Sequence, residues 1–137
     1  MPTGTTSQQV ADSIGSGLAR AVVVARIDGN LIDLNSPLEQ DCSLELFTGD
    51  TPEGHDTLLH STAHLMAQAV KELFPATKVT IGPTIENGFF YDFDVDVPFS
   101  DEVLARIEQK MKELAKSGQD IVRTEMSAGD AAKMFDK

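Results

Sequence analysis

Apolar residues change from a helical to a strand-like spacing in the middle of the chain, and this change constrains the fold most. After Asp56, apolar residues recur at helical intervals along one face, and Pro75 stops the pattern. The residues of that face are Leu59, Ala63, Met66, Val70 and Leu73. Apolar and polar residues then alternate over 89–95, as in a strand with one buried face. A helix on antiparallel strands is predicted, which is an α+β fold.

Capping and turn residues delimit the other elements. The sequence predicts helices over 7–14, from Ser100 to Gly118 and after Ser127, and strands over 21–27, 31–34, 42–47, 79–81 and 121–124. The apolar stripe of the helix expected between Ser100 and Gly118 consists of Val103, Leu104, Ile107, Met111 and Leu114. Asn87-Gly88 predicts a hairpin turn with positive φ. Residues 48–54 are rich in Gly and Pro, so we expect domains over 1–50 and 56–137, joined by a linker over 51–55.

Composition limits the class of protein. The chain has 137 residues, enough for one ordinary domain or two small ones, and its formal net charge of −11 opposes binding to a polyanion. Any RNA contact therefore needs cations from elsewhere. No apolar run approaches the ~20 residues that span a bilayer, so we expect no membrane partner. The lone Cys42 allows no internal disulfide, and a cytoplasmic location is expected.

His60 and His64 are four positions apart on the predicted helix, so both imidazoles can reach one small cavity. Three interpretations are open. The rings could be core-edge groups bonded to backbone carbonyls, or they could hold a metal, although no further ligand pair follows His64. They could also order and deprotonate a water molecule, since neutral imidazole is a base near pH 7.

Tyr91, the only tyrosine, has two interpretations: core packing with its hydroxyl at the rim, or a substrate contact. Asp92, Asp94 and Asp96 share the other strand face, which favours a solvated face over a cation site. Gly82-Pro83 lacks the spacing of a phosphate-binding loop and indicates a turn.

These segments together resemble a known family. The segments 60–65, 69–75, 80–83 and 87–94 resemble the start of the editing domain of the threonyl-tRNA synthetase family. Upstream, residues 10–19 and 28–34 are similar to its TGS domain, a small β-grasp module. The resemblance covers the chain in order. It implies a partial β-grasp domain, followed by the first part of an α+β editing domain with antiparallel strands.

The resemblance implies a role in accurate protein synthesis. The family joins threonine to its tRNA with ATP and Mg²⁺ in a separate catalytic domain that also holds a zinc ion, and it forms homodimers. Serine lacks one methyl group, worth only about 1–3 kcal/mol of discrimination, so the editing domain hydrolyses mischarged Ser-tRNA(Thr). By resemblance, His60 and His64 would position and activate the water, and Tyr91 would shape the pocket for the tRNA 3′ end. No metal ligand is implied in this chain.

Two departures from the family pattern qualify these implications. The family's later Cys-x-x-x-His segment does not follow His64, and the first two TGS strands do not precede the first helix. We therefore expect a fragment with little or no hydrolysis alone. The alternatives are a non-catalytic β-grasp binding or regulatory module, and a trans-editing deacylase related to alanyl-type editing proteins, with His60 and His64 as zinc ligands beside residues of another chain.

Overall fold

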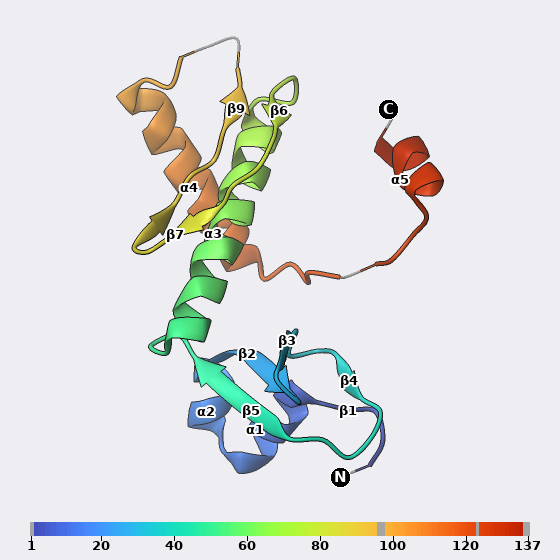
Figure 1. Cartoon of the computed structure of the whole chain (residues 1–137). Helices are drawn as coiled ribbons and strands as arrows, with labels where there is room; N and C mark the ends of the chain where they lie inside the picture. The colour runs from blue at the N-terminus through green and yellow to red at the C-terminus, as the bar shows by residue number, and fades with distance from the viewer. Residues whose placement is uncertain (1, 96–97, 123, 136–137) are drawn as a thin grey trace.

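The fold has two lobes joined by one long helix, α3 (Figure 1). The computed structural model describes residues 2–95, 98–122 and 124–135. The N-terminal lobe contains β1 (Thr5–Thr6), α1 (Ser7–Ile14), α2 (Ser16–Ala21), β2 (Val22–Ile27), β3 (Asn30–Ile32), β4 (Pro37–Leu38) and β5 (Leu44–Thr48). The second lobe contains β6 (Lys78–Val79), β7 (Thr84–Ile85), β8 (Gly88–Phe89), β9 (Phe93–Asp94) and α4 (Asp101–Ser117). The predicted α+β class is confirmed.

The N-terminal lobe is built on a three-stranded antiparallel sheet of order β3-β2-β5. A two-residue turn joins β2 to β3, with φ of 47° at Asp28 and 89° at Gly29, as a tight hairpin requires. The helix α1 begins with the expected capping box of Thr6 and Gln9. Ala11 of α1 is fully buried, as is Ala25 of β2. The short β1–β4 pair and α2 were not predicted.

The N-cap of the long helix α3 (Pro52–Leu73) lies five residues before Asp56, the predicted cap. Thr51 is its N-cap and accepts a hydrogen bond from the Gly54 N–H at 3.1 Å. Pro52 fits the first helical turn, where its missing N–H costs no hydrogen bond. The Gly- and Pro-rich stretch is thus partly a helix start, with residues 52–55 of the expected linker in the first turn of α3.

The strands of the second lobe form two nested antiparallel pairs, β6–β9 and β7–β8. The strand expected over 89–95 is interrupted, because only Phe89 and then Phe93–Asp94 pair with a neighbour. The inner turn lies at Glu86-Asn87, since Ile85 pairs with Gly88. Neither Asn87 nor Gly88 has positive φ. The predicted turn was therefore displaced by one residue, because Gly88 already belongs to the ladder.

The core of the second lobe lies between α3 and α4. Ser100 caps α4 by accepting from the Val103 N–H at 3.4 Å, and Gly118 ends it with φ of 62°. Both caps were predicted. The core cluster consists of Ala69, Val70, Ile107 and Leu114. Leu104, expected in the apolar stripe, is 50% exposed because it lies beside the packed face.

The last helix, α5 (Ala128–Phe135), stands apart from α3 and α4 (Figure 1). Ser127 accepts from the Asp130 N–H at 3.2 Å, as the sequence predicts for its start. The strand expected over 121–124 is wrong for its described residues, since Ile121, Val122 and Thr124 pair with no strand. Arg123 lies outside the described residues. A ladder needs a neighbouring strand, and Ile121 is instead 91% exposed.

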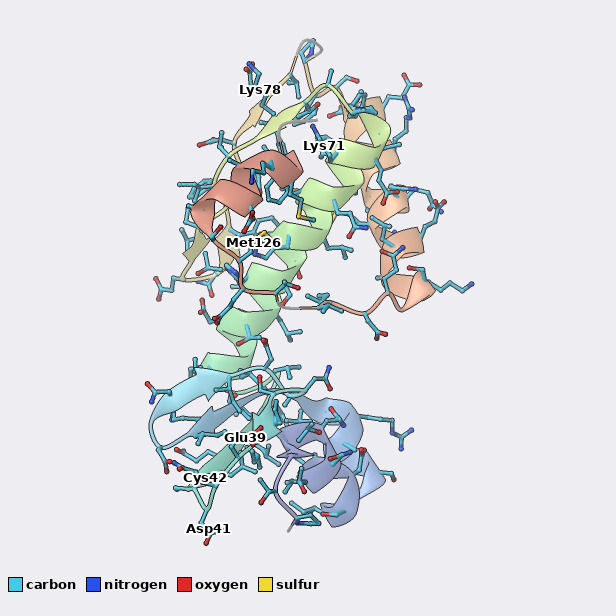
Figure 2. All side chains as sticks on the ribbon, turned by 90° about the vertical axis from the view of Figure 1, so that its right-hand side faces the viewer. Glu39, Asp41, Cys42, Lys71, Lys78 and Met126 are labelled. Atoms are coloured by element: carbon cyan, nitrogen blue, oxygen red, sulfur yellow. The ribbon has the colours of Figure 1, made fainter. Side chains whose placement is uncertain are left out.

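Lys71 binds backbone carbonyl groups just beyond the C-terminal end of α3. Its Nζ donates to the carbonyl oxygens of Pro75 at 2.7 Å and Thr77 at 2.9 Å. Figure 2 shows Lys71 and Lys78 together at this end, opposite the N-terminal lobe that carries Cys42. Among the described residues, the structure contains no helix with both the length and the apolar character needed to cross a bilayer.

Candidate functional site

His60 and His64 come together on adjacent turns of α3. Their Nε2 atoms are 2.9 Å apart, and the rings meet edge to face with centroids 4.5 Å apart and an interplanar angle of 83°. Neutral imidazole has one N–H donor and one acceptor nitrogen, so one Nε2–H donates to the other Nε2. The helical spacing alone brings the rings within reach. The sequence predicted this juxtaposition.

Both imidazoles are exposed to solvent. Each finds its hydrogen-bond partner in the other ring, and not in a backbone carbonyl as the core-edge interpretation requires. A solvent-exposed pair of this kind has two favourable arrangements. The rings can bond directly, or a third group can enter between the two Nε2 atoms and bond to both.

Tyr91 is anchored on the hairpin by other aromatic residues. Its ring stacks on Phe93 with centroids 4.7 Å apart and an interplanar angle of 17°, and Phe93 meets Phe99 edge to face at 5.8 Å. A Cβ at Gly82 would lie 2.6 Å from Tyr91 Cε2 and closer still to Cδ2, so the ring lies directly on this glycine. The sequence predicted three site residues, of which His60 and His64 contact each other and Tyr91 contacts Phe93 and Gly82.

Two of the hollows formed by the described residues lie on the second lobe, and the lining of neither includes these three residues. One of about 510 Å³ is lined by Phe74, Lys78, Asp94 and Phe99, among others, at the far end of α3. Another of about 290 Å³ lies between α3 and the end of α4. The predicted shared pocket for the histidines is therefore not one of these hollows. The pair lies instead on an open helix surface.

The described residues of the acidic strand face do not form a cation-binding site. Asp92 and Asp94 are exposed, and Asp94 pairs with Lys78 at 3.7 Å; Asp96 lies outside the described residues. Within residues 2–95, 98–122 and 124–135, no three His, Cys, Asp or Glu side chains are grouped to hold a metal ion.

Sequence reasoning missed Arg26, which connects the lobes. Its guanidinium donates to Glu53 of α3 at 2.8 Å, lies 3.5 Å from Glu45, and sits 4.6 Å from the centre of the Phe47 ring. The hydrogen bond with Arg26 lowers the pKa of Glu53, and the same bond raises that of Arg26. Because 27 positions separate Arg26 from Glu53, no local pattern could reveal this contact.

Comparison with known proteins finds sequence similarity that extends over both lobes. Residues 1–48 match the TGS domain family. A threonine–tRNA ligase of Citrifermentans bemidjiense is 53% identical over 135 residues, which are 98% of this chain and 21% of that protein. The chain is similar to the N-terminal fifth of these threonine–tRNA ligases in length and sequence. The ligase of Pelobacter propionicus is 52% identical over 96% of the chain, and that of Anoxybacillus flavithermus 46% over 99%.

The chain spans about a fifth of the length of these threonine–tRNA ligases, 21% in each case. The matched stretch runs through α3 and the nested hairpins, and so includes His60, His64 and Tyr91. The recognised resemblance to this family is confirmed.

Proposed function

We propose that this chain is the N-terminal region of a cytoplasmic threonine–tRNA ligase and contributes to hydrolytic editing of Ser-tRNA(Thr). The observation that carries the proposal is the 2.9 Å approach of His60 Nε2 to His64 Nε2 on an exposed helix face. Similarity to threonine–tRNA ligases along 98% of the chain supports it. The proposed partners are the 3′ end of tRNA(Thr) and a second copy of the full-length ligase.

The imidazole pair would bind and activate water. When the rings part, one Nε2–H can donate to the water oxygen while the other Nε2 accepts a water proton, each at about 2.8–3.0 Å. The oriented oxygen attacks the carbonyl carbon of the seryl ester, and the accepting imidazole takes the proton. The bond from that carbon to the ribose oxygen then breaks, the ribose oxygen takes a proton, and serine leaves as the free acid.

Tyr91 would contribute to substrate binding through its hydroxyl. Phe93 covers one face of its ring, and Gly82 lies against the Cδ2–Cε2 edge. The hydroxyl is therefore the group most available to the terminal adenosine or the aminoacyl group. The net charge of −11 repels RNA phosphates, so other parts of a ligase would supply the cations that hold the tRNA.

The experiment places this chain in a working ligase. A chimera replaces the corresponding fifth of the Citrifermentans bemidjiense ligase with these 137 residues, and release of serine from Ser-tRNA(Thr) is measured. We expect hydrolysis that His60→Ala or His64→Ala lowers by about 10²–10⁴-fold, the usual contribution of a general base. Threonylation by the separate catalytic domain should be unchanged.

His55→Ala is the matched control, because His55 is exposed on the first turn of the same helix. It should leave hydrolysis intact. Undiminished serine release in both His60→Ala and His64→Ala would refute the proposed roles. A chimera that threonylates tRNA but never releases serine would instead favour the non-catalytic binding module.

A further inference from the structure

The larger hollow, at the C-terminal end of α3, has the size and lining of a small-molecule site. Its volume of about 510 Å³ lies within the roughly 300–1,000 Å³ that such sites have. Small-molecule sites combine an apolar surface with a few polar groups that fix the orientation of the ligand. Here the apolar lining includes Leu73, Phe74 and Phe99, and the polar side chains are those of Thr77, Lys78 and Asp94.

The wall of this hollow that follows α3 is held in place by hydrogen bonds. Lys71 Nζ donates to the carbonyl oxygens of Pro75 at 2.7 Å and Thr77 at 2.9 Å, and the Thr77 N–H donates to the Phe74 carbonyl at 2.9 Å. Thr77 is only 4% exposed, and its hydroxyl makes no hydrogen bond to another residue that the structure describes. Because a buried hydroxyl without a partner costs free energy, a ligand that bonds to Thr77 gains affinity.

The charged groups of the lining have opposite signs. Lys78 Nζ lies 3.7 Å from Asp94 Oδ2, farther than the roughly 2.7–2.9 Å of a strong charge-assisted hydrogen bond. The side chains are 80% and 72% exposed, so the ion pair contributes little and each partner can bond to a ligand. A simple anion would be repelled by Asp94 and by the net charge of −11, and a simple cation by Lys78. A ligand with both charges satisfies both side chains.

We propose that this hollow binds a free aromatic amino acid. The α-carboxylate bonds to Lys78 and the α-ammonium to Asp94, while the ring packs against Phe74 and Phe99. The nitrogen and nearer carboxylate oxygen of an amino acid are about 2.7 Å apart, so the four charged groups alternate in sign around a closed ring. The Thr77 hydroxyl donates to the carboxylate. Phenylalanine side chains favour an aromatic ligand, since aromatic rings attract one another beyond the area that they bury.

A chain of ring contacts connects the hollow to the only tyrosine. Phe99 of the lining meets Phe93 edge to face at 5.8 Å, and Phe93 stacks on Tyr91 at 4.7 Å. A ligand that repositions Phe99 therefore changes the packing around Tyr91. The chain contains no tryptophan, so tyrosine fluorescence reports on this one residue. Neither imidazole lines the hollow, and the proposal does not depend on editing.

The test is a titration of the 137-residue chain with L-phenylalanine, followed by tyrosine fluorescence and independently by calorimetry. We expect saturation at one ligand per chain. Phenethylamine lacks the carboxylate and 3-phenylpropanoate lacks the ammonium, so each should bind roughly two- to fivefold more weakly. Glycine lacks the ring and should show no measurable binding. Thr77→Val removes one hydrogen bond and should weaken binding of L-phenylalanine by roughly two- to tenfold.

Ala76→Phe places a large side chain in the hollow from an exposed position of its lining, and should abolish binding. Ala105→Phe is the matched control, because Ala105 is exposed on α4 and does not line the hollow. It should leave the affinity unchanged, as should His60→Ala. Far-UV circular dichroism verifies that each variant is folded.

The absence of saturation in both fluorescence and calorimetry would overturn the proposal. Undiminished binding in Ala76→Phe would exclude this hollow as the site. Equal affinity for L-phenylalanine, phenethylamine and 3-phenylpropanoate would refute the roles of Lys78 and Asp94. Loss of serine release in the His60→Ala chimera with intact binding of L-phenylalanine would support both proposals, and failure of either measurement alone would refute only the proposal that it tests.

Discussion

Arg26 of β2 donates to Glu53 in the first turn of α3 at 2.8 Å, and this pair connects the two lobes directly. Both side chains are largely shielded, with 25% of the arginine and 30% of the glutamate exposed. Thr51 reinforces the junction, because its hydroxyl donates to the Thr48 carbonyl at 2.7 Å while accepting from Gly54. The helix that carries the histidines is thus fixed to the sheet with no flexible linker between them.

The Arg26–Glu53 pair should make stability depend on pH. Hydrogen bonding to Arg26 lowers the pKa of Glu53 below its ordinary 4.5 in the folded chain. Its stabilisation is therefore complete above that ordinary value and is lost as pH falls through the lower folded-state pKa. Glu53→Gln should lower Tm at pH 7, and the difference from wild type should shrink as the pH falls through the lowered folded-state pKa of Glu53. Thermal unfolding followed by circular dichroism gives the Tm of wild type and variant at each pH. As a control, Glu86→Gln lies in an exposed turn and should have the same Tm as wild type at pH 7.

Gly54→Ala should destabilise the junction. A Cβ at this position would overlap the Thr48 carbonyl oxygen and lie 2.7 Å from the Thr48 carbonyl carbon, so backbone must move. We expect a loss of about 1–3 kcal/mol in urea denaturation, despite the better helix propensity of alanine. Gly17→Ala in α2 is the control, because nothing lies within 4 Å of its Cβ. It should raise stability by about 0.5–1 kcal/mol; equal effects would disprove the packing argument.

Gly82→Ala should displace the Tyr91 ring, whose Cε2 would lie 2.6 Å from the new methyl group. The chain has one tyrosine and no tryptophan, so the near-UV circular dichroism of tyrosine reports on Tyr91 alone. We expect this band to change strongly in Gly82→Ala. In Gly88→Ala the new methyl meets Ile85 at an ordinary 3.8 Å, and the band should persist. A band that is the same in wild type and Gly82→Ala would contradict the contact.

Truncation of the core between α3 and α4 should be costly at buried positions only. Leu114 is 8% exposed and belongs to the core cluster, so Leu114→Ala should lower the free energy of unfolding by about 2–5 kcal/mol. Leu104→Ala removes the same atoms from a side chain that is 50% exposed, and should cost less than about 1 kcal/mol. Urea denaturation of both variants decides whether α4 packs in this register.

The histidine pair shows how far sequence reasoning reaches. Its geometry follows from helical spacing alone, so the meeting of His60 and His64 could be predicted. The surroundings of the pair could not, because they depend on where the hairpin lies against α3. Tyr91 packs on Phe93 and Gly82, and its role in the site stays a prediction.

Local chemistry by itself determined the helices with clear caps, the Asp28-Gly29 turn and the α+β class. These features depend on residues a few positions apart, whose hydrogen bonds form within one turn of chain. Tertiary structure alone decided the Arg26–Glu53 junction and the absence of a strand at Ile121-Val122. Each of these depends on a partner distant in sequence, and a local pattern carries no information about which distant group will be there.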